Sequence, residues 1–238
     1  MLVPLDIETT SNMYGLDKGA VPIGVASYLG PGQYKTIDIR CSGAYIQPSA
    51  MRVNKIETLE LDSEDRIPLT VADKLMASWL WDNLSDPANV HEHIMCGFNV
   101  GRFDRAFMDK FMPKTLKRVH AYRSYELNTI LAAWVGSNAP KLMWNRFKTL
   151  VKQEAMGHLE DEILIGYEEH HQLFDSALAY HMVKLHESSM GSRMGAMNRL
   201  LLIAGSDKEL ESMEDVRQTF IDLRAEETSE ADVVPEKV

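Results

Sequence analysis

The stretch Val3-Pro4-Leu5-Asp6-Ile7-Glu8-Thr9-Thr10 is the strongest indication of fold class in this chain. Its apolar residues predict a buried strand over residues 2–8, which two acids interrupt near its carboxyl end. Because successive strand side chains alternate between faces, Asp6 and Glu8 are expected on one face while their apolar neighbours enter the core. Two carboxylates side by side in an apolar strand repel each other and lose hydration, unless a divalent cation lies between them. The pair therefore predicts a metal site.

The spacing Asp-x-Glu alone is a weak signal, because the chain repeats it at Asp62-Ser63-Glu64 within a polar, charged stretch. We interpret that copy as a solvated loop. For Asp6 and Glu8 the alternative is a strand end that meets solvent. Two further stretches carry acids in a matching context and favour the metal site.

The second stretch is a predicted strand over residues 93–98, followed by the turn Asn99-Val100-Gly101 and a helix over residues 103–111. Asp104 stands at the start of this helix. It is either a first-turn acid that stabilises the helix dipole or a further metal ligand. Three aromatic residues recur at helical spacing and are predicted to pack in the core rather than stack on nucleotides: Phe103, Phe107 and Phe111.

The third stretch reads His170-His171-Gln172-Leu173-Phe174-Asp175 and precedes an amphipathic helix predicted over residues 175–188. Asp175 opens that helix, as a cap or as a metal ligand. His170 lies in the loop before it, and an imidazole with an ordinary pKa of about 6.5 suits a general base at neutral pH. The alternative is a surface histidine in an acidic loop.

Together the three stretches resemble the DEDD exonuclease superfamily, also called DnaQ-like or ribonuclease-T-like nucleases, in its histidine-bearing (DEDDh) branch. Asp6-Ile7-Glu8-Thr9 is similar to the first motif, Phe103-Asp104 to the second, and His170 through Asp175 to the third. The general base of this branch stands five residues before the last aspartate. That spacing favours His170 and leaves His171 as the runner-up. The resemblance covers about residues 1–190, and within it the layout is most similar to exonuclease A of T-even phages and its relatives.

Two positions depart from the family pattern. Gln172 stands where the histidine motif often carries alanine, and Asn99 stands five residues before Asp104 where the second motif often places asparagine four before. Neither departure removes a metal ligand. Both concern how a substrate would be positioned.

The resemblance implies a ribonuclease-H-like α/β fold, in which helices flank a mixed central sheet. It also implies a 3′ to 5′ exonuclease that hydrolyses single-stranded nucleic acid, with DNA favoured over RNA, using two divalent cations, Mg²⁺ or Mn²⁺. By the same resemblance Asp6 contacts both ions, Glu8 and Asp175 complete one, Asp104 holds the other, and His170 is the general base. Candidate substrate contacts are Thr9, Asn99, Arg102 and Phe103.

Composition fits one enzyme domain over residues 1–224, with a helical part at about 190–224 and an acidic tail at 225–238 that we expect to be disordered. The formal net charge is −10, and residues 207–238 contribute −7 of it through eleven acids and four bases. The acidic tail could dock a replication or repair protein. Part of the remaining negative charge comes from the predicted metal-binding carboxylates, and bound cations would offset it.

Basic residues gather after the second motif and again further on, where they could bind the phosphates of a single strand. The alternative is a solvated helical face. These residues are Arg102, Arg105, Lys110, Lys114, Lys117, Arg118 and Arg123, then Lys141, Arg146, Lys148 and Lys152. Candidates for stacking on bases, each with core packing as its alternative, are Tyr14, Tyr122, Tyr125 and Trp144.

The remaining pattern predicts strands near 20–29 and 33–41, helices near 70–84, 124–135 and 142–158, and a surface insertion over 44–68 near the substrate entrance. No apolar run approaches the length of a membrane span, and the first predicted strand begins at residue 2. We therefore expect no membrane segment, no signal peptide and a cytoplasmic protein, in the host cytoplasm if a phage encodes it.

Two other functions compete with the exonuclease. The chain could be an exonuclease fold that only binds nucleic acid, or a polymerase-associated proofreading subunit with little activity of its own. The five intact motif residues argue against the binding module, because loss of any of them would be its simplest sign.

Overall fold

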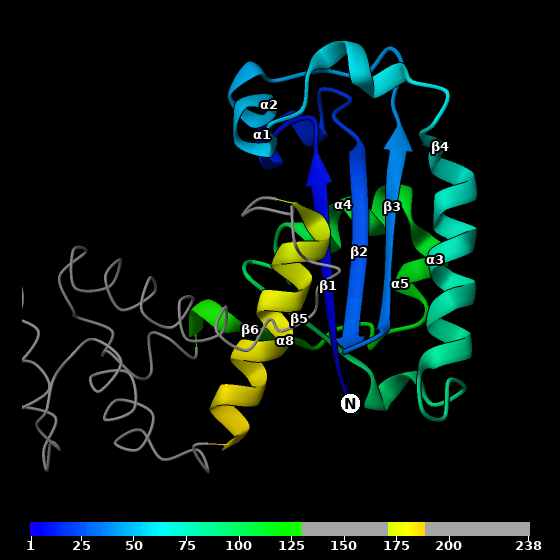
Figure 1. The fold of residues 1–238 in the computed structure, drawn as a ribbon, viewed down its shortest axis with the longest axis vertical. Coiled ribbons are helices and arrows are strands. Elements are labelled where there is room, and N and C mark those ends of the chain that lie inside the picture. The colour runs from blue at the N-terminus through cyan, green and yellow to red at the C-terminus, as the bar shows by residue number, and fades with distance from the viewer. Residues whose placement is uncertain (130–170, 189–238) are drawn as a thin grey trace, which may run out of the picture. The chain divides into compact units, whose positions relative to one another are not determined.

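The computed structural model describes residues 1–129 and 171–188 (Figure 1). The chain divides into two compact units, Met1–Ile130 with Ala155–Val183, and Leu131–Glu154 with Lys184–Val238. All contacts discussed below lie within the first unit. Several predicted features lie outside the described residues: His170, the helix at 142–158, Trp144, the four basic residues from 141 to 152, and everything from 189 to 238.

A six-stranded mixed sheet forms the centre of the first unit, in the order β4-β3-β2-β1-β5-β6. β2 runs antiparallel to both β1 and β3, whereas β5 runs parallel to β1 and β6, and β4 parallel to β3. This arrangement confirms the predicted α/β fold class. The strands are β1 (Leu2–Thr9), β2 (Pro22–Gly30), β3 (Gln33–Arg40), β4 (Ile67–Pro68), β5 (Ile94–Gly97) and β6 (Ser124–Glu126).

Helices cover both faces of this sheet. In Figure 1, α8 lies in front of β1, and α4 and α5 lie behind the strands. Side chains of α8 pack on β2, whereas those of α3, α4 and α5 pack in the main core on the other face. The helices are α1 (Met13–Leu16), α2 (Pro48–Asn54), α3 (Leu69–Asn83), α4 (Asp104–Phe111), α5 (Pro113–Leu116) and α8 (Gln172–Ser188), with the short 3₁₀ helices η1 (Thr58–Asp62) and η2 (Val90–Glu92). Within the described residues, no helix combines the length and apolarity needed to cross a bilayer.

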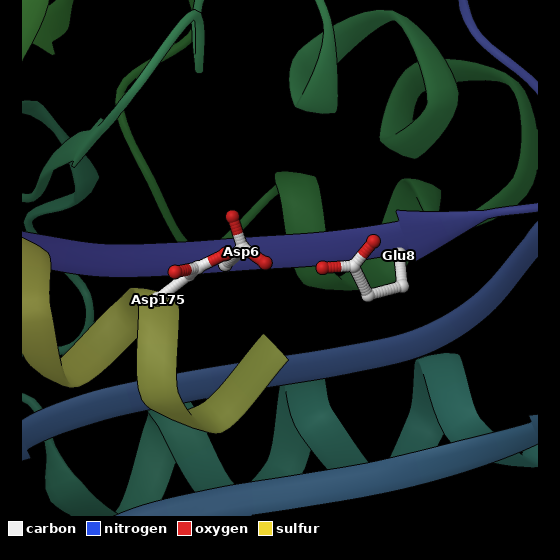
Figure 2. Close-up of side chains that lie close together, drawn as sticks. All are labelled: Asp6, Glu8 and Asp175. Carbon is white, nitrogen blue, oxygen red and sulfur yellow. The ribbon is translucent and has the colours of Figure 1, made fainter. Parts of the chain in front are cut away.

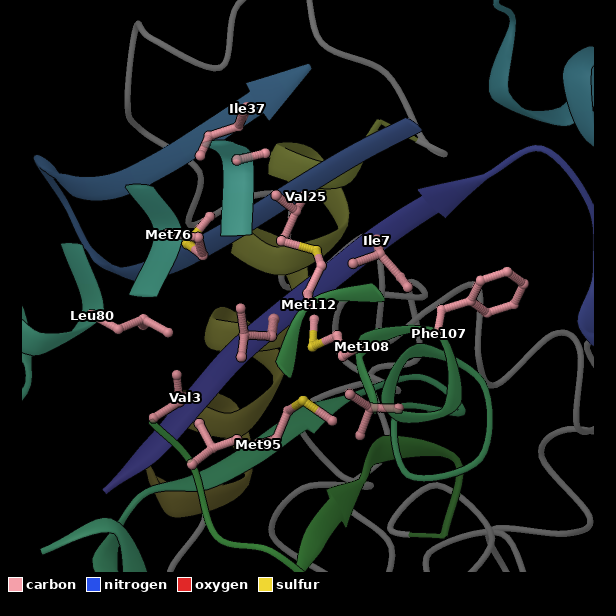
Figure 3. Packing of buried hydrophobic residues seen from close by; sticks show 14 of the residues in the cluster. Val3, Ile7, Val25, Ile37, Met76, Leu80, Met95, Phe107, Met108 and Met112 are labelled. Atoms are coloured by element: carbon pink, nitrogen blue, oxygen red, sulfur yellow. The ribbon is translucent and has the colours of Figure 1, made fainter. Parts of the chain in front are cut away.

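The period-two alternation of β1 decides which face of the strand is apolar. Val3, Leu5 and Ile7 enter the main core with side chains of α3 and α4, among them Met76 and Phe107 (Figure 3). Each fully buried apolar side chain of this size stabilises the fold by about 1.5–3 kcal/mol. On the opposite face a smaller cluster joins β2 to α8. Asp6 and Glu8 consequently face α8.

Residues 124–126 form a strand, so the helix predicted from residue 124 is wrong at its start. The reason is tertiary: β6 pairs with β5, with Met95 opposite Ser124 and Gly97 opposite Glu126. A parallel partner distant in sequence outweighs the local helix preference. The segment predicted as an irregular insertion, residues 44–68, contains α2, η1 and β4.

Candidate metal centre

Three carboxylates from two distant parts of the chain meet on the α8 face of β1. Asp6, Glu8 and Asp175 each offer an oxygen, and these oxygens all lie within 4.8 Å of one another. Figure 2 shows the three side chains gathered along one face of β1, with Asp175 projecting from α8. Asp6 and Glu8 point to the same side because they are two residues apart on a strand. The structure thus brings together three of the four acids that the motifs single out.

The electrostatic state of this cluster favours a bound cation. Burial, then repulsion from Asp104, Glu8 and Asp175, raises the pKa of Asp6 well above its ordinary value. Burial and neighbouring carboxylates likewise raise the pKa of Glu8. Oδ2 of Asp6 is buried and has no hydrogen-bond partner among the described residues. Carboxylate oxygens are the ligands that hard divalent cations prefer, so the donor set fits such a metal.

Asp104 lies beside this group but outside it, at the first turn of α4. Its Oδ1 accepts a hydrogen bond of 3.0 Å from the backbone nitrogen of Ile7, which ties the second motif to the first. The side chain is 3% exposed. Burial raises the pKa of Asp104 to about 8, although the hydrogen bond from Ile7 acts to lower it; repulsion from Glu126 and Asp175 adds to the rise.

Glu126 is a fifth carboxylate near the site, which the sequence reasoning missed. It ends β6, and its Oε1 accepts a hydrogen bond of 2.5 Å from the backbone nitrogen of Gly101. A Cβ at position 101 would lie 2.3 Å from the Ser124 hydroxyl, so the close approach requires glycine. The available signal was an acid at the end of a strand, the same context as Asp6 and Glu8. The helix prediction for this segment concealed it.

Of the two candidate histidines only His171 is described, because His170 lies outside the described residues. Nδ1 of His171 accepts a hydrogen bond of 3.2 Å from the backbone nitrogen of Leu173. The backbone carbonyl of His171 accepts a hydrogen bond of 3.0 Å from the backbone nitrogen of Asp175. His171 therefore caps α8. Burial lowers its pKa, and the Asp38 carboxylate offsets part of that effect. Within the described residues, no histidine joins the cluster of three acids.

Gln172 fastens the start of α8 to the sheet. Its Nε2 donates hydrogen bonds of 2.8 Å to Oδ1 of Asp38 and 3.3 Å to the hydroxyl of Thr36, both on β3. The side chain passes over Gly24 of β2, where a Cβ would lie 2.6 Å from Gln172 Cδ. Gly24 is opposite Glu8 on one side and Asp38 on the other, so this contact lies directly beside the carboxylates.

Two adjoining depressions open next to the carboxylates and share Asn12 and Phe103 in their walls. The first, of about 320 Å³, is lined by Glu8 and Thr9 and by residues of α2, including Ala50. The second, of about 350 Å³, has further walls formed by Met13, Asn99 and Arg102. All four candidate substrate contacts therefore line one or both depressions. The insertion at 44–68 also contributes a wall, through α2.

The aromatic and basic residues that the sequence suggested as nucleic-acid contacts lie in different parts of the structure. Phe107 is fully buried, whereas Phe103 and Phe111 are half-buried, and only Phe103 of the three lines the depressions beside the carboxylates. Among the stacking candidates, Tyr122 is exposed and Tyr125 is half-buried in β6. Three of the basic residues, Lys114, Lys117 and Arg118, line a separate depression against α3.

Solved structures that share this fold include nucleases. The zinc-bound complex of Escherichia coli exonuclease I with single-stranded DNA gives a TM-score of 0.55 at 14% identity, covering 85% of this chain and 44% of that chain. Exonuclease I of Methylocaldum szegediense gives 0.51 at 15% identity, covering 84% of this chain and 44% of that one. Cell-death related nuclease 4 gives 0.52 at 12% identity, with 81% and 64% covered.

This chain spans less than half the length of the exonuclease I structures that it matches. No protein-family model matches the chain, and no curated protein matches it in sequence. At identities of 12–15% the likeness establishes the shared fold.

Proposed function

We propose that this chain is a metal-dependent 3′ to 5′ exonuclease that hydrolyses single-stranded nucleic acid, with DNA preferred to RNA. The observation that carries the proposal is the group of carboxylates of Asp6, Glu8 and Asp175, within 4.8 Å of one another. It occurs in a fold shared with nucleases, one of which is solved with bound single-stranded DNA.

The donor set fits divalent cations because several half-buried carboxylates gather at one place in the described residues. Asp6, Glu8 and Asp175 with Asp104 would hold two ions, Mg²⁺ or Mn²⁺, which would activate a water molecule and stabilise charge on the leaving oxygen. The buried Oδ2 of Asp6, which has no hydrogen-bond partner among the described residues, supports this assignment. So do the raised pKa values of Asp6 and Glu8, since a cation would favour their ionised forms.

We assign the remaining steps to other residues of the motifs. His170, which the sequence predicts to lie in the loop before α8, would accept a proton from the attacking water, in keeping with its place five residues before Asp175. His171 is the weaker candidate, because its Nδ1 already accepts a hydrogen bond from the backbone of α8. Thr9 and Phe103 would position the terminal nucleotide, since both line the depression that contains Glu8. Asn99 and Arg102 would contact the strand in the adjoining depression.

Other parts of the prediction rest on sequence alone. They are the single domain boundary at residue 224, the closer likeness to phage exonuclease A, a cytoplasmic location, and docking of a replication or repair protein on the acidic residues 225–238.

Degradation of 5′-labelled single-stranded DNA and RNA of matched sequence tests this function, with Mn²⁺, Mg²⁺ or a chelator. The variants are Asp6→Ala and, as a matched control, Asp62→Ala, which removes the first acid of the exposed second copy of the Asp-x-Glu pattern. We expect a metal-dependent ladder that shortens from the 3′ end, is absent for Asp6→Ala and is unchanged for Asp62→Ala.

Three outcomes would contradict the proposal. Shortening from the 5′ end would refute the polarity, and cleavage that persists in chelator would refute the metal dependence. Binding of the strand without cleavage under every metal condition would favour the nucleic-acid-binding module instead.

A further inference from the structure

We propose that a basic groove between α3 and α5 is a second binding surface for the phosphate backbone of a nucleic-acid single strand, separate from the carboxylates. The groove has a volume of about 410 Å³. Its charged, polar and aromatic walls are Lys74, Ser78, Trp81, Lys114, Lys117 and Arg118. The inference extends the proposed function, because it concerns how a long substrate strand would be held.

The spacing of these residues explains how two helices form one basic surface. Lys74, Ser78 and Trp81 recur at helical intervals, so they share one stripe of α3. The stripe that includes Met76 and Leu80 faces the core, which leaves the first stripe outward. The chain at and after α5 then adds three cations along the opposite wall of the groove.

A buried acid holds the two walls together. Asp73 of α3 is 4% exposed, and its Oδ1 accepts hydrogen bonds of 2.8 Å and 2.9 Å from the backbone nitrogen and hydroxyl of Thr115. Its Oδ2 accepts a hydrogen bond of 3.2 Å from the backbone nitrogen of Lys114. The carboxylate of Asp73 therefore caps α5. These hydrogen bonds fix the segment that carries Lys114, Lys117 and Arg118 against α3 before any ligand binds.

The cations of the groove have no acidic partner in the part of the chain that the structure describes. Within residues 1–129 and 171–188, none of Lys74, Lys114, Lys117 and Arg118 forms an ion pair. The Arg118 guanidinium lies 4.6 Å from the ring centroid of Trp81, and its Nε is buried without a hydrogen-bond partner among the same residues. Trp81 is nevertheless 42% exposed. In a chain with a net charge of −10, one groove thus gathers four cations, none of them ion-paired with another described residue, beside an exposed indole.

Phosphate is the anion that this chemistry fits best. A positively charged groove with an aromatic side chain is the usual arrangement for sequence-independent binding of single strands. The planar guanidinium of Arg118 matches phosphate geometry, and Lys74, Lys114 and Lys117 supply point charges around it. The groove lies against helices on the face of the sheet opposite α8, so it is distinct from the cluster of Asp6, Glu8 and Asp175. A long strand could therefore contact both surfaces.

Binding in chelator tests the groove without requiring any turnover. Fluorescence anisotropy would follow a labelled poly-dT strand of about 25 nucleotides, long enough to reach beyond one site, over a range of salt concentrations. The variant is Lys114→Glu/Lys117→Glu, which alters two exposed side chains of the groove. The matched control is Lys18→Glu/Lys35→Glu, which makes the same change in charge at two positions outside it.

We expect the groove variant to bind about tenfold more weakly than the parent, and the slope of log Kd against log salt to fall by about 1.4, the loss of two phosphate contacts. The control should retain the parental slope. With metal, degradation of a strand of about 4 nucleotides should be unchanged in the groove variant, because so short a strand would occupy only the carboxylate site.

Equal weakening in both variants, or in neither, would overturn the proposal. It would also be overturned if poly-glutamate displaced the strand as effectively as unlabelled poly-dT does at the same charge concentration, because the groove would then recognise an acidic peptide. If the chain binds the strand through the groove but cleaves nothing, the binding proposal is supported and the proposed exonuclease activity is refuted. The two proposals can therefore be refuted separately.

Discussion

The side-chain amide of Gln172 donates a hydrogen bond of 2.8 Å to the carboxylate of Asp38, a residue 134 positions earlier in the chain. This bond joins the first turn of α8 to β3, three residues before Asp175 reaches the other two acids of the metal centre. The position of Asp175 therefore depends on a polar contact outside the group of acids. An alanine at this position would remove that contact.

Replacing Gln172 with alanine should loosen the placement of Asp175. The variant loses the hydrogen bonds to Asp38 and Thr36 and leaves a cavity above Gly24, which we expect to cost about 1–3 kcal/mol of stability. Because groups that orient metal ligands control affinity, the Mn²⁺ concentration for half-maximal activity should rise about tenfold. A metal titration of nuclease activity checks this expectation.

Ser176→Ala is the matched control for that substitution. Its hydroxyl donates to the carbonyl of Leu173 within α8, so its removal breaks a buried hydrogen bond without releasing the helix from the sheet. An equal rise in the metal requirement of Ser176→Ala would show that any damage to α8 has the same effect. The specific role of Gln172 would then be wrong.

Gly24→Ala should destabilise the protein only while Gln172 is present. The added methyl group would meet the Gln172 side chain at 2.6–2.8 Å, and moving that flexible side chain breaks its hydrogen bonds to β3. We therefore expect a loss of about 1–3 kcal/mol in the parent and much less in a Gln172→Ala background. Urea unfolding of both single variants and the double variant measures the coupling. Additive losses would mean that Gly24 is required for another reason.

Without metal, the stability of the protein should fall as the pH rises from about 4 to 8. The folded state keeps the Asp104 proton up to a pKa of about 8, whereas an unfolded aspartate loses its proton near 3.8. In that interval the folded state binds more protons, so raising the pH favours unfolding, by about 1.4 kcal/mol per pH unit for each extra proton. Thermal unfolding in chelator, followed by circular dichroism across this pH range, measures the dependence.

Asp104→Asn should remove part of this dependence, because its amide oxygen can still accept the hydrogen bond from Ile7 but cannot ionise. In chelator the variant should be more stable than the parent at pH 8 and similar near pH 4. With saturating Mn²⁺ the order should reverse, and nuclease activity should fall by about 100-fold or more. Parallel stability curves for the two proteins would refute the raised pKa of Asp104.

Asp73→Ala should be among the most destabilising substitutions in α3. It removes three hydrogen bonds that Asp73 accepts from Lys114 and Thr115, and leaves buried donors unsatisfied, at an expected cost of about 2–4 kcal/mol. Asp82→Ala, an exposed position of the same helix, is the control and should change stability by less than about 0.5 kcal/mol. Chemical denaturation compares them, and similar losses would refute the capping role of Asp73.

Local patterns predicted the described elements that carry the acids. Alternation in β1 implied one shared face for Asp6 and Glu8, and the helical periods placed Asp104 and Asp175 at or near the starts of their helices. The pattern did not reveal Glu126, because the strand that carries it depends on pairing with β5. The sequence pattern also did not predict the contacts of Gln172, because Asp38 and Gly24 become its neighbours only when α8 packs on the sheet.

Periodicity in the sequence predicted which acids stand near strand ends and helix starts, because this periodicity depends on neighbours a few positions apart. Which of those residues meet depends on how the elements pack in three dimensions. Asp175 joins Asp6 and Glu8, and Glu126 lies near Asp104. The basic residues Lys114, Lys117 and Arg118 pack against α3. These contacts depend on strand order, register and helix packing, which arise from burying apolar faces that are far apart in the chain.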